Sequence, residues 1–172
     1  KDCIISDVGS TKGNIYDRMK AVKGDFFYIG GHPMTGSEKF RYTASKEHLF
    51  ENAYYIVAPD ERVPQYMVEN FTRVIKQIGA IPVEVSPYLH DYIVASISHV
   101  PHIIASSLCN NVRILDTPQG HMHKIAAGGF KDITRIASSN PDMWESICFE
   151  NREDILSVLS SLEDVVGGLK KA

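Results

Sequence analysis

Residues 30–38, Gly30-Gly31-His32-Pro33-Met34-Thr35-Gly36-Ser37-Glu38, follow a short apolar run, Phe26–Ile29. The run is rich in aromatic and β-branched residues, a composition typical of a buried strand. The two glycines favour a tight turn or a close approach of the backbone to a ligand. A histidine in a glycine-rich turn at the carboxyl end of a strand occupies the position where open α/β sheets carry their chemistry. A surface histidine in a simple turn fits this stretch equally well.

The residues around this stretch predict an α/β arrangement. Strands are expected at 3–8, 26–29, 54–58 and 81–85, and helices at 14–22 and 63–78. Alternation at this spacing favours a mostly parallel sheet. The turn after the first strand, Asp7-Val8-Gly9-Ser10-Thr11-Lys12-Gly13, exposes backbone amides at a helix start and suits an anion or part of a nucleotide.

The pattern changes at Pro87, after which only helices are predicted. They cover 88–111, 120–127, 129–138, 142–149 and a last segment that Asn151 is expected to cap. Pro101 should interrupt the first of these helices, because it cannot bond to the carbonyl of Ile97. We therefore divide the chain into an α/β domain, 1–86, and an all-α domain, 87–172.

Composition excludes several classes of protein. The 172 residues are 44% hydrophobic and 23% charged, with a formal net charge of -3 and no basic block, so neither nucleic acid nor an anionic membrane is an expected partner. No apolar run approaches the ~20 residues of a membrane span. Three separated cysteines, Cys3, Cys109 and Cys148, predict buried free thiols in a reducing cytoplasm.

Two groups of titratable residues lie in the helical half. One group comprises His90-Asp91 with His99 and His102, and His121-x-His123 follows later. No third nearby ligand completes a metal site, so we predict none. In the other group, Gly128-Gly129 precede Asp132 and Arg135, which form either an intrahelical ion pair or, through the arginine, a clamp for a carboxylate.

Four motifs occur in a fixed order: residues 7–13, 31–38, 98–102 (Ser-His-Val-Pro-His) and 128–135 (Gly-Gly-Phe-Lys-Asp-Ile-Thr-Arg). Together with Met143-Trp144 and Asn151, they resemble the prephenate dehydrogenase family of tyrosine biosynthesis. The resemblance covers nearly the whole chain. Thr11 and Lys131 depart from the family pattern, in which Val and Arg are expected.

The resemblance implies a fold, a reaction and a set of roles. The fold is the C-terminal part of a Rossmann-like parallel sheet followed by a helical dimerisation domain. The reaction is the NAD-dependent oxidative decarboxylation of prephenate to 4-hydroxyphenylpyruvate by a cytoplasmic homodimer, with tyrosine as a feedback inhibitor. The implied roles are a proton acceptor, a serine that assists it, and groups that bind substrate and cofactor. The resemblance implies that His32 is the proton acceptor and that Ser10 assists it. It assigns prephenate binding to Arg135, His102, Trp144 and Glu38, and NAD binding to Gly9, Ser10 and Gly31. It implies a structural role for His99.

The resemblance also predicts what precedes this chain. Family members begin with a GxGxxG nucleotide-binding unit, which does not occur among these 172 residues. We therefore expect a fragment that lacks the N-terminal nucleotide-binding half and is inactive on its own. Arogenate or cyclohexadienyl substrates, and a non-catalytic dimeric fragment, are the alternative interpretations.

Overall fold

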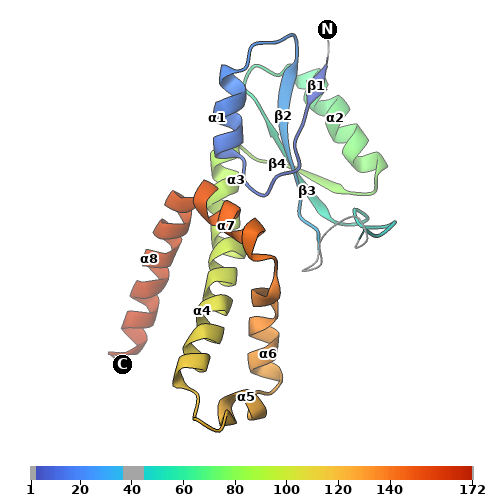
Figure 1. The fold of residues 1–172 in the computed structure, drawn as a ribbon. Coiled ribbons are helices and arrows are strands. Elements are labelled where there is room, and N and C mark those ends of the chain that lie inside the picture. The colour runs from blue at the N-terminus through green and yellow to red at the C-terminus, as the bar shows by residue number, and fades with distance from the viewer. Residues whose placement is uncertain (1–2, 37–44, 172) are drawn as a thin grey trace.

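A computed structural model describes residues 3–36 and 45–171. The predicted order, α/β followed by all-α, is confirmed (Figure 1). The elements of the first half are β1 (Ile4–Ile5), α1 (Gly13–Ala21), β2 (Phe27–Pro33), β3 (Tyr54–Pro59), α2 (Gln65–Gln77) and β4 (Ile81–Glu84). Those of the second half are α3 (Pro87–Val94), a π-helical segment (Ala95–His99), α4 (Val100–Leu115), α5 (His121–Ile125), α6 (Gly128–Thr134), a 3-10 segment (Arg135–Ser138), α7 (Pro141–Glu150) and α8 (Arg152–Leu169).

The sheet has the strand order β1-β2-β3-β4 and is mostly parallel, as predicted. β1 pairs with β2 and β3 with β4 in parallel, whereas β2 and β3 are antiparallel. Helices α1 and α2 supply the crossovers that the two parallel pairs need. Between β2 and β3 the described residues, 34–36 and 45–53, contain no helix, and the chain returns in the opposite direction.

The core of the first half lies between the sheet and α2. Ile29, Tyr55 and Val57 project from the strands and pack with Val68 and Ile75 of α2. All five are buried, and burying each such side chain stabilises the fold by about 1.5–3 kcal/mol. This core fixes β2, and with it the strand end that carries His32.

Strand β2 extends through Pro33, so the predicted turn at residues 30–36 is wrong for its first four residues. Gly30 and Gly31 are paired with β3. A Cβ on Gly31 would lie 2.5 Å from the carbonyl oxygen of Asp7, and one on Gly30 would lie 3.0 Å from the Lys12 side chain. The glycines therefore allow the loop after β1 to pack closely against the strand.

The long helix of the second half runs from Pro87 to Leu115 with an irregular segment inside it. The N–H of Val100 donates to the carbonyl of Ala95, five residues back, which is the π-helical pattern. The irregularity expected at Pro101 therefore precedes the proline. By length and composition this run could cross a membrane, which the sequence analysis did not expect. Core helices of globular proteins satisfy the same two criteria, so the match is weak evidence for a span. In this chain, 33% of the apolar window is buried inside the structure.

The other helices pack around α4. α8 and α6 run along it on different sides, and α5 lies at its far end (Figure 1). Ala95, Val100 and Ile155 form the small buried core of this half. The predicted burial of the cysteines is wrong, because Cys3 is exposed and Cys109 and Cys148 are only partly buried.

Asn151 precedes α8 as predicted, but its side chain makes no capping hydrogen bond. Its amide nitrogen donates to the carbonyl of Asp91 over 2.8 Å and lies 3.0 Å from Nδ1 of His99. The side chain is buried between α3, the π-helical segment and α8. It therefore ties these elements together.

Candidate active site

A cleft of about 500 Å³ lies where the end of β2 meets the helical half. Five of the residues that the sequence singled out line it together, although they are separated by up to 134 positions. They are Ser10, His32, His102, Arg135 and Trp144. Glu38 lies outside the described residues. Gly9 and Gly31 do not line the cleft, and both lie close to Asp7.

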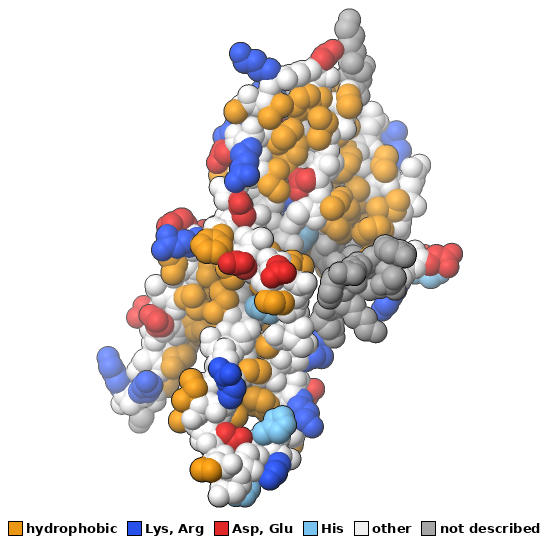
Figure 2. All heavy atoms as spheres, viewed as in Figure 1, with side chains coloured by type: hydrophobic (Ala, Val, Ile, Leu, Met, Phe, Trp, Pro, Cys, Tyr) orange, Lys and Arg blue, Asp and Glu red, His pale blue; other side chains and the backbone are white. Residues whose placement is uncertain are grey.

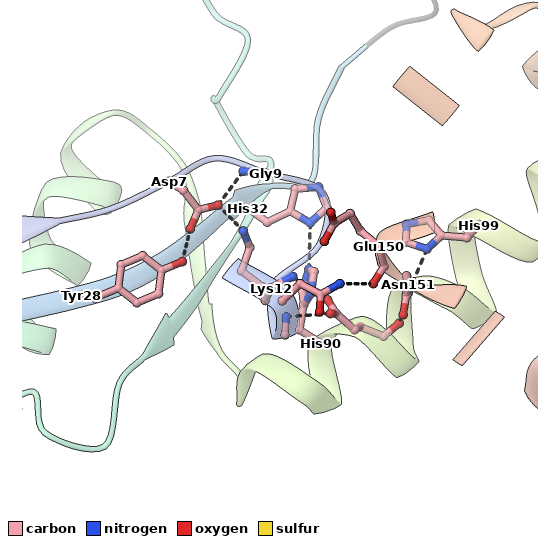
Figure 3. Close-up of polar contacts among 12 residues, drawn as sticks. Asp7, Gly9, Lys12, Tyr28, His32, His90, His99, Glu150 and Asn151 are labelled. Carbon is pink, nitrogen blue, oxygen red and sulfur yellow. Dashed lines mark hydrogen bonds and ion pairs between the residues drawn. The ribbon is translucent and has the colours of Figure 1, made fainter. Parts of the chain in front are cut away.

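His32 stands at the end of β2, opposite Ile56 of β3. Its Nδ1 lies 2.8 Å from Nε2 of His90, and the rings meet edge to face (Figure 3). Burial, followed by the charges of His90 and Lys12, lowers the pKa of His32 to about 4. The imidazole is therefore neutral at pH 7 and can accept a proton.

The loop that carries Ser10 is held by a partly buried ion pair between Lys12 and Asp7. The carboxylate of Asp7 accepts hydrogen bonds from Lys12 Nζ, from the backbone N–H of Gly9 at 2.7 Å and from the Tyr28 hydroxyl at 2.5 Å (Figure 3). Burial alone would raise the pKa of Asp7, but the bonds from Lys12 and Tyr28 outweigh it and the pKa is lowered. Burial lowers the pKa of Lys12. No local pattern in the sequence predicts that this lysine is only 1% exposed.

Behind His32 lies a network that sequence reasoning did not assemble. Nδ1 of His90 lies 2.8 Å from Oδ1 of Asp91, and both residues are buried. The Asp91 carboxylate also accepts from the backbone N–H groups of Lys12 and Gly13, each at 2.7 Å. Adjacent His and Asp were visible in the sequence, but partners 58 to 79 positions away were not.

The opposite wall is built around an aromatic stack. The rings of His102 and Trp144 are parallel to within 1°, with centroids 3.6 Å apart. His102 Nδ1 and Trp144 Nε1 are buried and have no hydrogen-bond partner among residues 3–36 and 45–171. A buried N–H without a partner is costly, and a ligand with acceptor oxygens would satisfy the one on Trp144.

Two further residues complete this wall. Arg135 is exposed at the start of the 3-10 segment and lines the cleft. His99 contacts the edge of the Trp144 ring, at 6.0 Å between centroids, and burial lowers its pKa to about 4. Among residues 3–36 and 45–171, no group of three His, Cys, Asp or Glu side chains is placed to hold a metal ion.

The fold and the cleft define a class of protein: a Rossmann-type α/β sheet joined to a helical domain, with a neutral histidine at a strand end in a cleft that Arg135 and Trp144 also line. The family models agree. Residues 1–84 match the nucleotide-binding domain of prephenate dehydrogenase and residues 86–172 match its dimerization domain. The chain belongs to the prephenate dehydrogenase family.

Individual relatives give the same result. A prephenate dehydrogenase of Bacillus subtilis is 43% identical over 90% of this chain and 42% of its own length. A structure of prephenate dehydrogenase from A. aeolicus, in complex with hydroxyphenyl propionate and NAD+, has a TM-score of 0.88 at 34% identity and covers 98% of this chain and 58% of that one. Synechocystis arogenate dehydrogenase has a TM-score of 0.85 at 26% identity over 98% and 60%. The chain thus spans about half the length of the relatives it matches.

Proposed function

We propose that this chain provides the substrate cleft and the proton acceptor of an NAD-dependent prephenate dehydrogenase. The single observation that carries the proposal is the neutral His32, which shares one cleft with Arg135 and the His102–Trp144 stack. Oxidative decarboxylation of prephenate needs a base for the ring hydroxyl and partners for two carboxylates. The cleft contains residues suited to both tasks.

In this proposal His32 accepts the proton of the ring hydroxyl, and Ser10 helps to orient that hydroxyl. Bound NAD would supply the acceptor for the hydride of the hydroxyl-bearing carbon. The ring carboxylate leaves as carbon dioxide, and its electron pair makes the ring aromatic. His32 can then return the proton to the phenolate oxygen, so that protons and electrons balance. The loop with Gly9 and Ser10, packed against Gly31, suits only the nicotinamide end of the cofactor.

The carboxylates are assigned to the other wall. Arg135 offers the planar fork that binds a carboxylate through two hydrogen bonds. Trp144 adds a buried ring N–H that lacks a partner among the described residues, and His102 stacks on the Trp144 ring and lines the same wall. The complex of the A. aeolicus enzyme holds hydroxyphenyl propionate, which combines a phenol with a side-chain carboxylate, as the expected product does. We assign Glu38 to the same substrate site.

Arogenate is the second candidate substrate, because the Synechocystis structural relative is an arogenate dehydrogenase. Arogenate carries an amino group where prephenate carries a keto oxygen, so few contacts would change. Tyrosine also combines a phenol with a side-chain carboxylate, and we propose that it competes for the cleft. We propose a cytoplasmic location, in keeping with three free cysteines.

We propose that the helical half, residues 87–172, forms a homodimer and that residues 1–86 form the cofactor-side domain. Figure 2 shows hydrophobic side chains gathered over the helices. Many are large and exposed, including Ile97 at 63%, Ile114 at 76% and Leu169 at 75%. A monomer would leave this apolar surface in water. Light scattering that reports a monomer at micromolar concentration would contradict the dimer.

The test of function is turnover by the natural full-length protein. We expect NADH formation with prephenate and NAD, abolished by omitting either and inhibited by tyrosine. Arogenate, offered in parallel, decides between the two substrates. Binding of NAD without oxidation of either substrate would refute the proposed activity.

A further inference from the structure

The network behind His32 forms a chain of hydrogen bonds that leads away from the cleft. His32 contacts His90 and His90 contacts Asp91, each through nitrogen or oxygen atoms 2.8 Å apart (Figure 3). His90 is 1% and Asp91 5% exposed, so water does not supply alternative partners. Both ring nitrogens of His90, and Nδ1 of His32, must therefore each be a donor or an acceptor toward a known atom.

The starting point is the Asp91 carboxylate, because all of its partners can be assigned. Oδ1 accepts from the N–H of Lys12, and Oδ2 accepts from the N–H of Gly13. A backbone N–H can only donate. With donors on both oxygens the carboxylate acts as an acceptor, and Nδ1 of His90 must carry a proton to bond with it.

The proton position on His90 then determines the proton position on His32. A His90 ring whose single proton is on Nδ1 has a lone pair on Nε2. His32 can bond to that lone pair only by donating from its own Nδ1. The nitrogen of His32 that remains for a ligand, Nε2, is then unprotonated. The opposite tautomer of His32 would place two acceptors against each other, 2.8 Å apart.

We propose that Asp91 and His90 are positioning residues that hold His32 in the Nδ1–H tautomer, with Nε2 free to accept a proton in the cleft. The catalytic consequence rests on the proposed function, whereas the tautomer itself does not. Asp91 also fixes the backbone near Ser10, because the carboxylate that orients His90 accepts hydrogen bonds from the N–H groups of Lys12 and Gly13. The side chain of Asp91, in α3, thus helps to position both the loop that carries Ser10 and the ring of His32.

Other charged groups near His32 belong to different elements. Lys12 of the loop before α1 and His99 of the π-helical segment disfavour a proton on His32, and Asp7 favours one. Within the described part of the chain, the His32 ring bonds to His90, whereas Lys12 bonds to Asp7 and His99 to Asn151. They influence how readily the ring takes a proton, whereas His90 decides which nitrogen is available.

The tautomer is tested first by NMR of histidine ring nitrogens in the natural full-length protein at pH 7, without substrate. We expect a protonated Nδ1 and an unprotonated Nε2 for His32. A protonated Nε2 on His32, or a doubly protonated His90, would overturn the inference. Because no substrate is needed, this result is independent of whether the protein oxidises prephenate.

Kinetics of two His90 variants test the consequence. His90→Leu removes the acceptor for His32 Nδ1–H, and we expect kcat to fall roughly 10- to 100-fold, with KM for prephenate within about twofold, because the wrong tautomer cannot act as base. His90→Gln keeps a donor toward Asp91 and an acceptor toward His32, and should restore kcat to within about fivefold of the parent.

His121→Gln, on the exposed α5, is the matched control and should change neither constant. Equal losses in His90→Leu and His90→Gln, or a rise in KM alone, would overturn the positioning role. If His90→Leu does not fold, the ring-nitrogen spectrum of the parent protein and the kcat of His90→Gln still decide the matter.

Discussion

Replacing His32 by Asn in the natural full-length protein should remove a base without removing a hydrogen-bonding side chain. General-base catalysis contributes about 10²–10⁴ in rate, so kcat should fall by that factor. KM for prephenate should change little, because the proposed carboxylate partners lie on the other wall of the cleft. His121→Asn, in an exposed helix, is the control.

The pH profile gives this prediction a magnitude. With the pKa of His32 lowered to about 4 by burial and neighbouring charge, about 90% of the free enzyme still holds the base form at pH 5. An unperturbed histidine, with a pKa of about 6.5, would leave only about 3%. The acid limb of kcat/KM should therefore lie near pH 4 and not near the 6.5 of an unperturbed histidine.

The assay is the initial rate of NADH formation between pH 4 and 8, with folding checked by circular dichroism at each pH. His32→Asn should lose the acid limb together with most of the rate. A parent limb near 6.5 that persists in the variant would refute His32 as the base. A stable variant that binds prephenate and keeps a tenth of the normal rate would do the same.

Three further outcomes are expected. Arg135→Lys should weaken carboxylate binding by about 1.5–3 kcal/mol and raise KM for prephenate, with NAD binding unchanged. The control, Arg113→Lys, should leave KM unchanged. A loss of kcat alone would exclude Arg135 as the group that binds the carboxylate. Asn151→Ala should reduce the free energy of unfolding in urea by about 1–3 kcal/mol, because it leaves Nδ1 of His99 unpaired and removes one of the donors to the Asp91 carbonyl, and the exposed Asn110→Ala should not. The free energy of unfolding should fall as pH drops from 6.5 to 4, because His32 and His99 bind protons in the unfolded chain but stay unprotonated in the folded one. The slope approaches about 1.4 kcal/mol per pH unit for each histidine. Urea midpoints that stay constant over this range would contradict the prediction.

The order of elements could be predicted from the sequence because strand and helix periodicities are local. The end of β2 could not. Gly30 and Gly31 were interpreted as turn residues, yet they continue the strand because Lys12 and Asp7 fill the space that a side chain would need. A glycine selected by close packing looks the same in sequence as one selected by a turn.

The cleft was predictable to the extent that its residues belong to motifs. Ser10, His32, His102, Arg135 and Trp144 were all chosen from such motifs and lie together. The residues that support them were not predictable in the same way. Asn151 appeared to be a helix cap, but its amide nitrogen donates to the carbonyl of Asp91, 60 positions away. Such roles depend on the arrangement of elements in space.

The π-helical segment limits where residues can be inserted into or deleted from the long helix. Each α-helical residue turns the chain by about 100°, so His99, eight residues after Asp91, would point about 80° away from it in a regular helix. A π-helical turn accommodates one extra residue, which brings the two to within about 20° of the same direction. One side chain, Asn151, can then reach both. Deleting a single residue between 95 and 99 would rotate His99 and His102 about the helix axis relative to the sheet, whereas substitutions at the exposed Ser96 would leave that rotation unchanged. The length of this segment is therefore more tightly constrained than the identity of its exposed residues.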